Sequence, residues 1–346
     1  MKNRHRSRLA WPVALLLLAA CGGGGSDAPD AGNGATRRDT VLILQHEAVA
    51  YDETRQVYYA TVSPTDTERG NRIVTLSPQG SVAATSEPIG SNPTALAVSR
   101  DGSRLYVALG GSAEILQYAL PSFSLLGRLT LPMDSSRYQT FAEQIAVSPT
   151  DPNTIAVSLA YPSGSPRHAG VALVRDMNLL PDRTPTHTGS NRIGFDASGA
   201  AVYGFNNETT EFGLRRLAFT GTGIREAAVT PVAEADFSWD MHVSERLVLV
   251  GNKAFTVGTL APRGVVAGAS FHCVTTPSAA RVACFSTDYG RLVVAEAQSF
   301  TRAGEVAFPE TSATAAFTLV RGPSGQVVAS AQASGRLYFI NSELLR

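Results

Sequence analysis

The chain has 346 residues, of which 29 are basic and 29 acidic, so its formal net charge at pH 7 is zero. No basic run indicates nucleic-acid binding, and no acidic run indicates a metal-loading tail. Only two lysines are present, Lys2 and Lys253, which argues against lysine-based covalent catalysis. After the first twenty residues, no stretch is apolar enough to cross a bilayer.

The first twenty residues have the parts of an export signal. Four basic residues and no acidic one stand at the start, and an apolar run follows from Leu9 to Ala20. This run is too short for a bilayer core of roughly 30 Å. Residues 1–20 are therefore interpreted as a cleavable signal peptide.

The apolar run ends in Leu18-Ala19-Ala20-Cys21, which resembles the bacterial lipobox. The resemblance implies that the Cys21 thiol carries a diacylglyceryl group, that cleavage makes Cys21 the first mature residue, and that this lipid holds the protein on a membrane. The residue after Cys21 is Gly22 and not Asp, which resembles the pattern of Gram-negative lipoproteins that are sorted to the outer membrane. The resemblance implies a location on the periplasmic face of that membrane or on the cell surface. The alternative is an ordinary secretory signal with an incidental cysteine.

Residues 21–39 predict a flexible tether. Four glycines follow Cys21, and the remainder is rich in Asp, Gly, Pro and Asn, with little to bury. Such a segment stays extended and solvated. We therefore expect the folded domain to occupy residues 40–346.

From residue 40 onward, short runs of Val, Leu, Tyr and Ala are separated by Gly, Pro, Asp, Asn and Ser, which predicts strands joined by turns. A two-strand unit recurs seven times, with turn centres near residues 52, 101, 151, 198, 244, 278 and 324. The first four copies are clear. The last three, which begin at 239, 273 and 317, are more degenerate. Two further strands fit after most copies, and four strands at this period are typical of a β-propeller blade.

The two ends of this region complete the count. The seventh unit has room for three strands, the last at 337–341, and a spare strand at 40–45 precedes the first unit. We predict an all-β, seven-bladed propeller in which the N-terminal strand completes the last blade, because closure leaves only short protected edges. The alternative is a β-sandwich or two smaller β domains.

The segment from Ile89 to Ala108, with the sequence IGSNPTALAVSRDGSRLYVA, resembles the YVTN-type repeat of bacterial and archaeal seven-bladed propellers. Residues 71–76 are similar to the third strand of that repeat. The resemblance is good over the first two blades and loose beyond the fourth. It implies the same fold and indicates little about function, since propellers have many unrelated activities.

Cys273 and Cys284 flank a predicted turn near 277–280, which places them opposite each other on adjacent antiparallel strands. An oxidising compartment permits a disulfide there. Two buried free thiols are the alternative, because cysteine is a common small core residue.

Polar residues stand where the inner strands of the blades begin, so we expect them to line the mouth of the central channel. They are His46, Glu47, Asn92, Glu143, Arg192, Asp240, His242 and His272. A resemblance to propeller lactonases and lyases implies hydrolase or lyase chemistry, in which two histidines and two carboxylates hold a divalent metal or act as acid and base. The alternative is the polar lining of any water-filled opening. No motif identifies a catalytic nucleophile, and we expect no cofactor.

Two longer polar loops, 63–70 and 161–169, are predicted to lie on the same face as the channel mouth. Loops on a rigid scaffold commonly carry recognition. We therefore expect a monomeric binding or scaffolding module for a protein or cell-envelope ligand, without nucleic acid. The competing expectation is an enzyme with its site at the channel mouth.

Overall fold

The computed structural model describes residues 39–134, 136–187, 189–287, 290–309 and 317–346. The predicted signal peptide (1–20), Cys21 and all of the predicted linker except Asp39 lie outside these residues. Within the described ranges, no helix has the length and apolar character needed to span a membrane.

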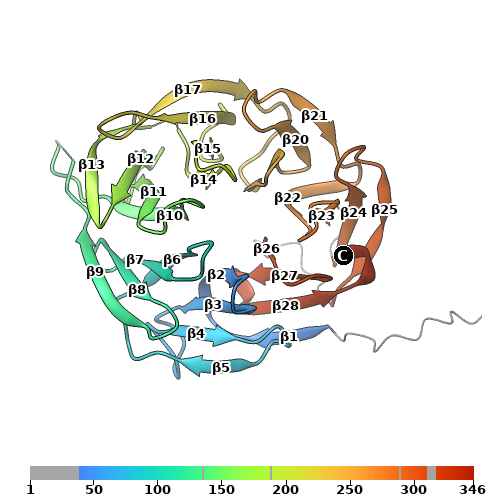
Figure 1. Cartoon of the computed structure of the whole chain (residues 1–346), viewed down its shortest axis with the longest axis horizontal. Coiled ribbons are helices and arrows are strands. Elements are labelled where there is room, and N and C mark those ends of the chain that lie inside the picture. The colour runs from blue at the N-terminus through green and yellow to red at the C-terminus, as the bar shows by residue number, and fades with distance from the viewer. Residues whose placement is uncertain (1–38, 135, 188, 288–289, 310–316) are drawn as a thin grey trace, which may run out of the picture. The chain divides into compact units, whose positions relative to one another are not determined.

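Seven four-stranded antiparallel sheets surround a central opening, and each sheet is one blade (Figure 1). The first three blades, from inner to outer strand, are β2 (His46–Asp52), β3 (Val57–Val62), β4 (Ile73–Leu76), β5 (Val82–Thr85); β6 (Pro93–Val98), β7 (Arg104–Leu109), β8 (Glu114–Ala119), β9 (Ser124–Thr130); and β10 (Phe141–Val147), β11 (Thr154–Ala160), β12 (His168–Arg175), β13 (Asn178–Arg183). The seven-bladed fold predicted from the repeats is confirmed.

The next three blades follow the same order. They are β14 (Arg192–Phe195), β15 (Ala201–Phe205), β16 (Gly213–Phe219), β17 (Ile224–Pro231); β18 (Met241–Val243), β19 (Leu247–Val250), β20 (Lys253–Thr256), β21 (Pro262–Val265); and β22 (Ala269–Thr275), β23 (Arg281–Ser286), β24 (Arg291–Glu296), β25 (Arg302–Ala307). The seventh blade and the short 3-10 turns are β26 (Phe317–Arg321), β27 (Gln326–Ala331), β28 (Arg336–Asn341), β1 (Thr40–Ile43), η1 (Gln332–Ser334) and η2 (Glu343–Leu345).

The hydrophobic core consists of layers between neighbouring blades. Each blade is covered on both sides, so its middle strands are almost wholly apolar: every residue of β11 and β15 is buried, whereas most of the outer strand β9 is exposed. In the layer between the first and seventh blades, Tyr58 and Leu76 pack with Leu337 and Phe339. Tyr58 also donates a hydrogen bond of 2.7 Å to the buried side chain of Gln326 across the same boundary.

Strand β1 closes the ring, as the sequence predicts. It pairs with β28 from Thr40 opposite Phe339 to Ile43 opposite Arg336, so the start of the domain lies beside its last strand (Figure 1). Leu44, immediately after β1, is buried in the layer between the first and seventh blades. The seventh blade therefore consists of both ends of the domain.

The fifth blade departs from the sequence-based expectation. Its inner strand was predicted at 239–243, but β18 begins only at Met241. Trp239 instead packs against Gly251, where the backbone has a φ of +53° and an added Cβ would lie 2.2 Å from the indole ring. The backbone N–H of Asp240 donates to the carbonyl of Phe271 in the sixth blade. The first residues of this segment thus connect two blades rather than extend a strand.

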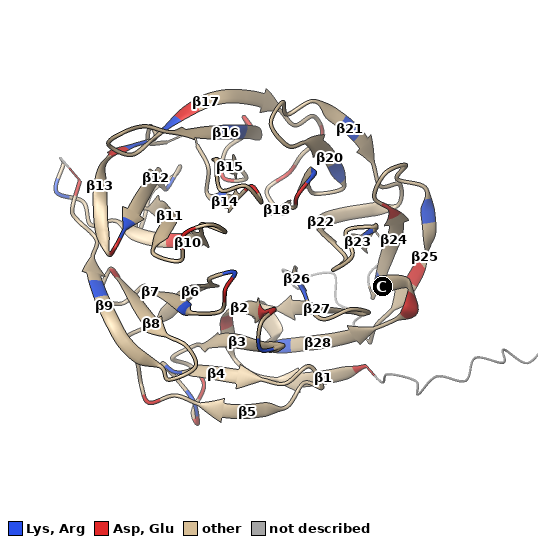
Figure 2. Ribbon diagram, in the orientation of Figure 1, with Lys and Arg blue, Asp and Glu red and all other residues tan. Residues whose placement is uncertain are grey.

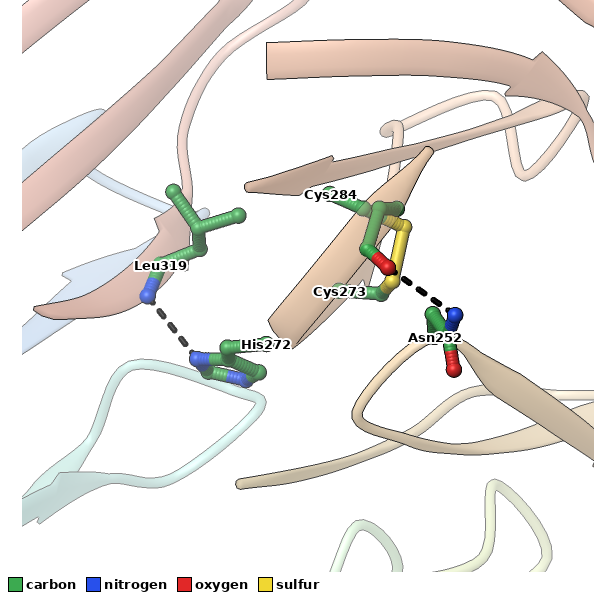
Figure 3. The surroundings of a disulfide bond; sticks show 6 residues. Asn252, His272, Cys273, Cys284 and Leu319 are labelled. Atoms are coloured by element: carbon green, nitrogen blue, oxygen red, sulfur yellow. Dashed lines mark hydrogen bonds between the residues drawn. A yellow bond between two sulfur atoms is a disulfide. The ribbon is translucent and has the colours of Figure 1, made fainter. Parts of the chain in front are cut away.

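Cys273 and Cys284 face each other on β22 and β23 and are joined by a disulfide (Figure 3). Their Cα atoms are 4.0 Å apart, and both side chains are buried. The bond closes a short loop around the turn between the two strands, on the inner side of the sixth blade.

Replacing both cysteines by alanine should lower the free energy of unfolding by roughly 2–3 kcal/mol, because a disulfide that closes a loop of this length restricts the unfolded chain by about that amount. Denaturant titration with and without reductant measures the effect. Reductant should destabilise the wild type and leave the Cys273→Ala/Cys284→Ala variant unchanged. A wild type insensitive to reductant throughout unfolding would contradict the prediction.

Candidate functional site

The inner strands of the blades surround a central channel that contains two overlapping cavities. The first has a volume of about 420 Å³ and is lined where the inner strands begin, by residues that include Glu47, Thr94, Glu143, Arg192, Asp240 and His272. The second, of about 470 Å³, is lined where these strands end. Figure 2 shows charged residues gathered around this opening. We call the first cavity the mouth cavity, and the side of the ring that carries it the mouth face.

Irregular pairing of the inner strands brings several of these side chains into the mouth cavity. The register of β2 with β3 shifts between His46 and Ala48, that of β6 with β7 between Pro93 and Ala95, and that of β10 with β11 between Ala142 and Gln144. In each case one residue has no partner in the strand pair, and all three of these residues, Glu47, Thr94 and Glu143, line the cavity. A bulge of this kind re-aims a side chain.

Six of the eight predicted mouth residues line the cavity, namely Glu47, Glu143, Arg192, Asp240, His242 and His272. His46 does not, because the bulge at Glu47 turns its ring away from the channel. The His46 ring is buried, with Nδ1 2.8 Å from the carbonyl oxygen of Leu44 and Nε2 2.7 Å from Oγ of Ser330 in the seventh blade. Both ring nitrogens therefore form hydrogen bonds at the boundary between the first and seventh blades. Burial lowers the pKa of His46.

Asn92 also lies away from the mouth cavity. Its backbone has a φ of +54°, its N–H donates a 2.8 Å hydrogen bond to Oδ1 of Asn71, and its carbonyl accepts from the N–H of Gly110. Asparagine tolerates this left-handed conformation better than most residues. Asn92 thus shapes the loop between the first two blades instead of presenting a ligand group.

A chain of charges crosses the mouth from the third blade to the fifth. The guanidinium of Arg192 lies 3.9 Å from Oε1 of Glu143 and 3.6 Å from Oδ1 of Asp240. Arg167 lies 3.7 Å from the same Glu143 oxygen and donates a 2.9 Å hydrogen bond to Oε1 of Glu208. Only the last of these contacts is within hydrogen-bond distance. The charged side chains of the mouth therefore lie close together, but most of them are not joined by hydrogen bonds.

Burial and neighbouring charges shift the pKa values of the two central carboxyl groups, Glu143 and Asp240, in opposite directions. Burial raises the pKa of Glu143, and the nearby Glu208 raises it further, against the lowering effect of Arg192. Burial would also raise the pKa of Asp240, but His272, Arg192 and the N–H of Met241, which donates at 2.7 Å, together lower it. Because burial keeps His272 neutral near pH 7, Arg192 and the Met241 N–H are the groups that keep Asp240 ionised there.

The two histidines of the mouth are held in their neutral forms. Nδ1 of His272 accepts a 2.9 Å hydrogen bond from the backbone N–H of Leu319, so the ring proton is on Nε2 (Figure 3). The 3.7 Å approach of Asp240 to the same Nδ1 is thus a contact with a neutral ring and not an ion pair. Burial lowers the pKa of His272, and burial together with His272 lowers the pKa of His242 to about 3. Nε2 of His242 lies 3.1 Å from Oγ1 of Thr275.

This arrangement can bind a ligand by charge and hydrogen bonding. Among the described residues, no three His, Cys, Asp or Glu side chains are grouped so that they could hold a metal ion. A general acid would need a proton to donate near neutral pH, and neither mouth histidine carries an extra one, which leaves Glu143, whose pKa burial raises, as the candidate for that role. The mouth supplies carboxylates, a guanidinium and the Nε2–H of His272.

Sequence reasoning missed Glu208 and its neighbour Asn207. Both follow β15, in the loop of the fourth blade that corresponds to the loops 63–70 and 161–169. The N–H of Asn207 donates to Oδ1 of Asn191 at 3.0 Å, and its side chain donates to the carbonyl of Trp239 at 2.7 Å. The polar run Asn206-Asn207-Glu208 directly after an apolar strand was the signal that could have identified this loop.

Comparisons with known proteins identify the fold and no family. No family model matches the chain, and no curated protein matches its sequence. Among solved structures, it is similar to the β-propeller domain of Myceliophteria thermophila Cps50 (Swd1), with a TM-score of 0.66 and 14% identity over 88% of this chain and 98% of that one. It is also similar to Kuenenia stuttgartiensis hydrazine synthase, with a TM-score of 0.62 and 9% identity over 92% of this chain and 99% of the other.

Proposed function

We propose that this protein is an exported lipoprotein, anchored to the outer membrane of a Gram-negative bacterium through lipid on Cys21, whose propeller binds a protein or cell-envelope ligand. The lipobox-like sequence before Cys21 supports the anchor, and the Gly- and Asp-rich residues 21–39 would serve as its tether. The resemblance of residues 89–108 to the YVTN repeat supports a relationship to that group of propellers. A tethered ring can present one face to a partner while the lipid holds it at the membrane.

Exposed aromatic and apolar residues on the mouth face are the observation that carries the binding proposal. Met133, Tyr138 and Phe237 are 61%, 64% and 58% exposed, and all three lie in loops that lead from an outer strand to the next inner strand. Large exposed apolar side chains beside a polar rim are typical of interaction sites.

Contacts beneath these loops hold the two exposed rings in place. Tyr138 packs edge-on against Tyr161, whose hydroxyl donates a 2.8 Å hydrogen bond to Asp134, and Phe237 packs against Phe212 with ring centroids 5.1 Å apart. Rings that are already ordered lose less entropy when a partner binds. This supports recognition by the mouth face.

A lactonase- or lyase-like activity at the channel mouth is the weaker candidate. It was expected to use two histidines with two carboxylates. Of the three candidate histidines, His46 lies between blades with both ring nitrogens in hydrogen bonds, and His242 and His272 line the mouth cavity with their rings kept neutral by burial. Nδ1 of His272 is likewise occupied by a backbone N–H. The geometry therefore favours binding over acid–base chemistry.

Site-specific photocrosslinking in the intact producing cell tests the binding proposal. A photoreactive phenylalanine analogue at Tyr138 or Phe237 should give a discrete crosslinked adduct. The matched control is Leu125, a 49% exposed residue of β9 on the outer rim. An adduct from the mouth face that is missing from position 125 is expected. Equal crosslinking at all three positions, or none at the mouth face, would contradict the proposal.

A further inference from the structure

The mouth carries more negative than positive charge. Glu47, Glu53, Glu143 and Asp240 line the cavity with Arg192 and Arg321, and the adjoining pair is Glu208 with Arg167. The mouth histidines His242 and His272 are neutral near pH 7 because burial lowers the pKa of each. Five acidic side chains thus face three guanidinium groups. Since the walls around these charges exclude much of the solvent, the imbalance is screened less than it would be on an open surface.

Several polar atoms of the mouth have no hydrogen-bond partner. Oε2 of Glu143, Oε2 of Glu208 and Nε of Arg192 are all inaccessible to solvent and unbonded. Buried polar atoms are nearly always satisfied in folded proteins, and an exception calls for an explanation. Two of the three are carboxyl oxygens, and an ionised carboxylate accepts hydrogen bonds only. A positively charged donor would favour the ionised form of Glu143, whose pKa burial raises, and would satisfy both oxygens.

The guanidinium of Arg192 lies between Glu143 and Asp240 without forming a hydrogen bond to either of them. It stands between Glu143 and Asp240 at 3.9 and 3.6 Å, too far for hydrogen bonds, and about a third of its side chain is exposed. A partly exposed ion pair of this kind contributes little to stability. Arg192 can swing toward solvent at small cost and leave two carboxylates for an incoming cation.

His272 adds a requirement on the rest of the ligand. Its side chain is only 7% exposed and lines the mouth cavity, and Nδ1 is already used by the Leu319 N–H. The Nε2–H that remains is a donor, so an acceptor elsewhere on the ligand would complement it. A basic side chain on a polypeptide offers both, since a peptide carbonyl always accompanies it.

We propose that the mouth cavity binds the guanidinium or ammonium group of a basic residue in a partner polypeptide, with Glu143 and Asp240 as its acceptors and Arg192 as the group it displaces. This inference rests on the proposed binding function and specifies its ligand. The exposed Tyr138 and Phe237 around the mouth supply apolar contact for the flanking residues of the same segment. Arg192 is a competitor within the site, so it weakens binding of the ligand.

Titration calorimetry on the full-length protein in detergent tests this proposal. The probes are a short glycine-rich peptide with one central arginine, the same peptide with norleucine in place of arginine, and free propylguanidinium. The arginine peptide should bind at least tenfold more tightly than the norleucine peptide. Propylguanidinium, which carries a single positive charge, distinguishes the sources of the cation: it should bind more weakly than the peptide, because it has no carbonyl for His272. Propylguanidinium binding as tightly as the peptide would overturn the assignment to a polypeptide.

Substitutions in the mouth make the test specific. Glu143→Gln and Asp240→Asn should each weaken the arginine peptide at least tenfold, whereas Glu87→Gln, at a carboxylate side chain that is 96% exposed and outside the cavity, should leave its affinity unchanged. Arg192→Ala should strengthen binding several-fold, which a merely structural role would not produce. Thermal unfolding of each variant checks that it is folded.

Two results would overturn the inference: equal affinity for the arginine and norleucine peptides, or weaker binding of the arginine peptide by Arg192→Ala, which would show that Arg192 supports the site and does not compete with the ligand. If crosslinking from Tyr138 and Phe237 persists alongside either result, the proposed binding function is still supported, and only the assignment of a cationic ligand is contradicted. Loss of the crosslinks would instead contradict the binding function itself.

Discussion

Deleting residues 40–45 should lower the free energy of unfolding by at least roughly 4 kcal/mol, the largest effect expected for so short a change. The deletion removes β1, which pairs with the outer edge of β28, and uncovers Leu337 and Phe339, which are buried in the closed ring. It also removes Leu44, and losing one buried leucine side chain alone costs about 2–5 kcal/mol. Denaturant titration followed by circular dichroism measures the loss.

Two single substitutions refine this test of ring closure. Leu44→Ala should account for about half of the loss, because Leu44 is 2% exposed, whereas Ile43→Ser on the same strand should change stability by less than about 0.5 kcal/mol, because Ile43 is 73% exposed. Wild-type stability in the deletion variant would show that β1 does not close the ring.

Acidification from pH 7 to pH 4 should destabilise the fold, and His168 alone should contribute about 3 kcal/mol. The His168 ring is buried, Nε2 accepts from the N–H of Ser190, and burial together with Arg215 lowers its pKa to about 4. In the unfolded chain the same ring binds a proton near pH 6.5. The unfolded state therefore binds more protons as the pH falls from about 6.5 to 4, and stability declines over that range. Above about pH 7 both states are neutral and this contribution is constant.

Unfolding free energies measured at several pH values test this expectation. His168→Gln should remove about 3 kcal/mol of the acid dependence. His242, whose pKa burial lowers to about 3, should contribute a similar amount, and His46 and His272, whose pKa values burial also lowers, should contribute further. His187→Gln is the matched control, because that side chain is exposed on a neighbouring loop. If His168→Gln retained the full wild-type pH dependence, the His168 ring would have to be accessible to protons in the folded state.

The fold could be predicted from the sequence because a propeller repeats the same four-stranded unit, with the same pattern of apolar strands and polar turns, seven times. Each blade needs two middle strands covered on both sides, which gives continuous apolar runs such as 154–160 and 201–205. Between them lie turn residues at nearly regular intervals. The seventh unit has room for only three strands, so the spare strand at 40–45 was predicted to pair with its open edge and close the ring.

The site could be predicted only in part, because one-residue irregularities decide which side chains face the channel. His46 and Glu47 are neighbours, and the bulge in β2 sends Glu47 into the cavity and His46 between blades. Shifting the register by one residue exchanges the two faces of a strand, and composition does not reveal where that shift occurs. Glu208 was missed because its contact with Arg167 joins loops of two different blades.

Mass spectrometry of the N-terminal peptide from membrane-associated protein tests the proposed lipid anchor most directly. We expect a mature chain that starts at Cys21 and carries a diacylglyceryl group on the thiol and an acyl chain on the amine. Cys21→Ala should abolish this modification and release the protein from the membrane fraction. A mature N-terminus elsewhere, or an unmodified Cys21 in wild-type protein, would contradict the anchor.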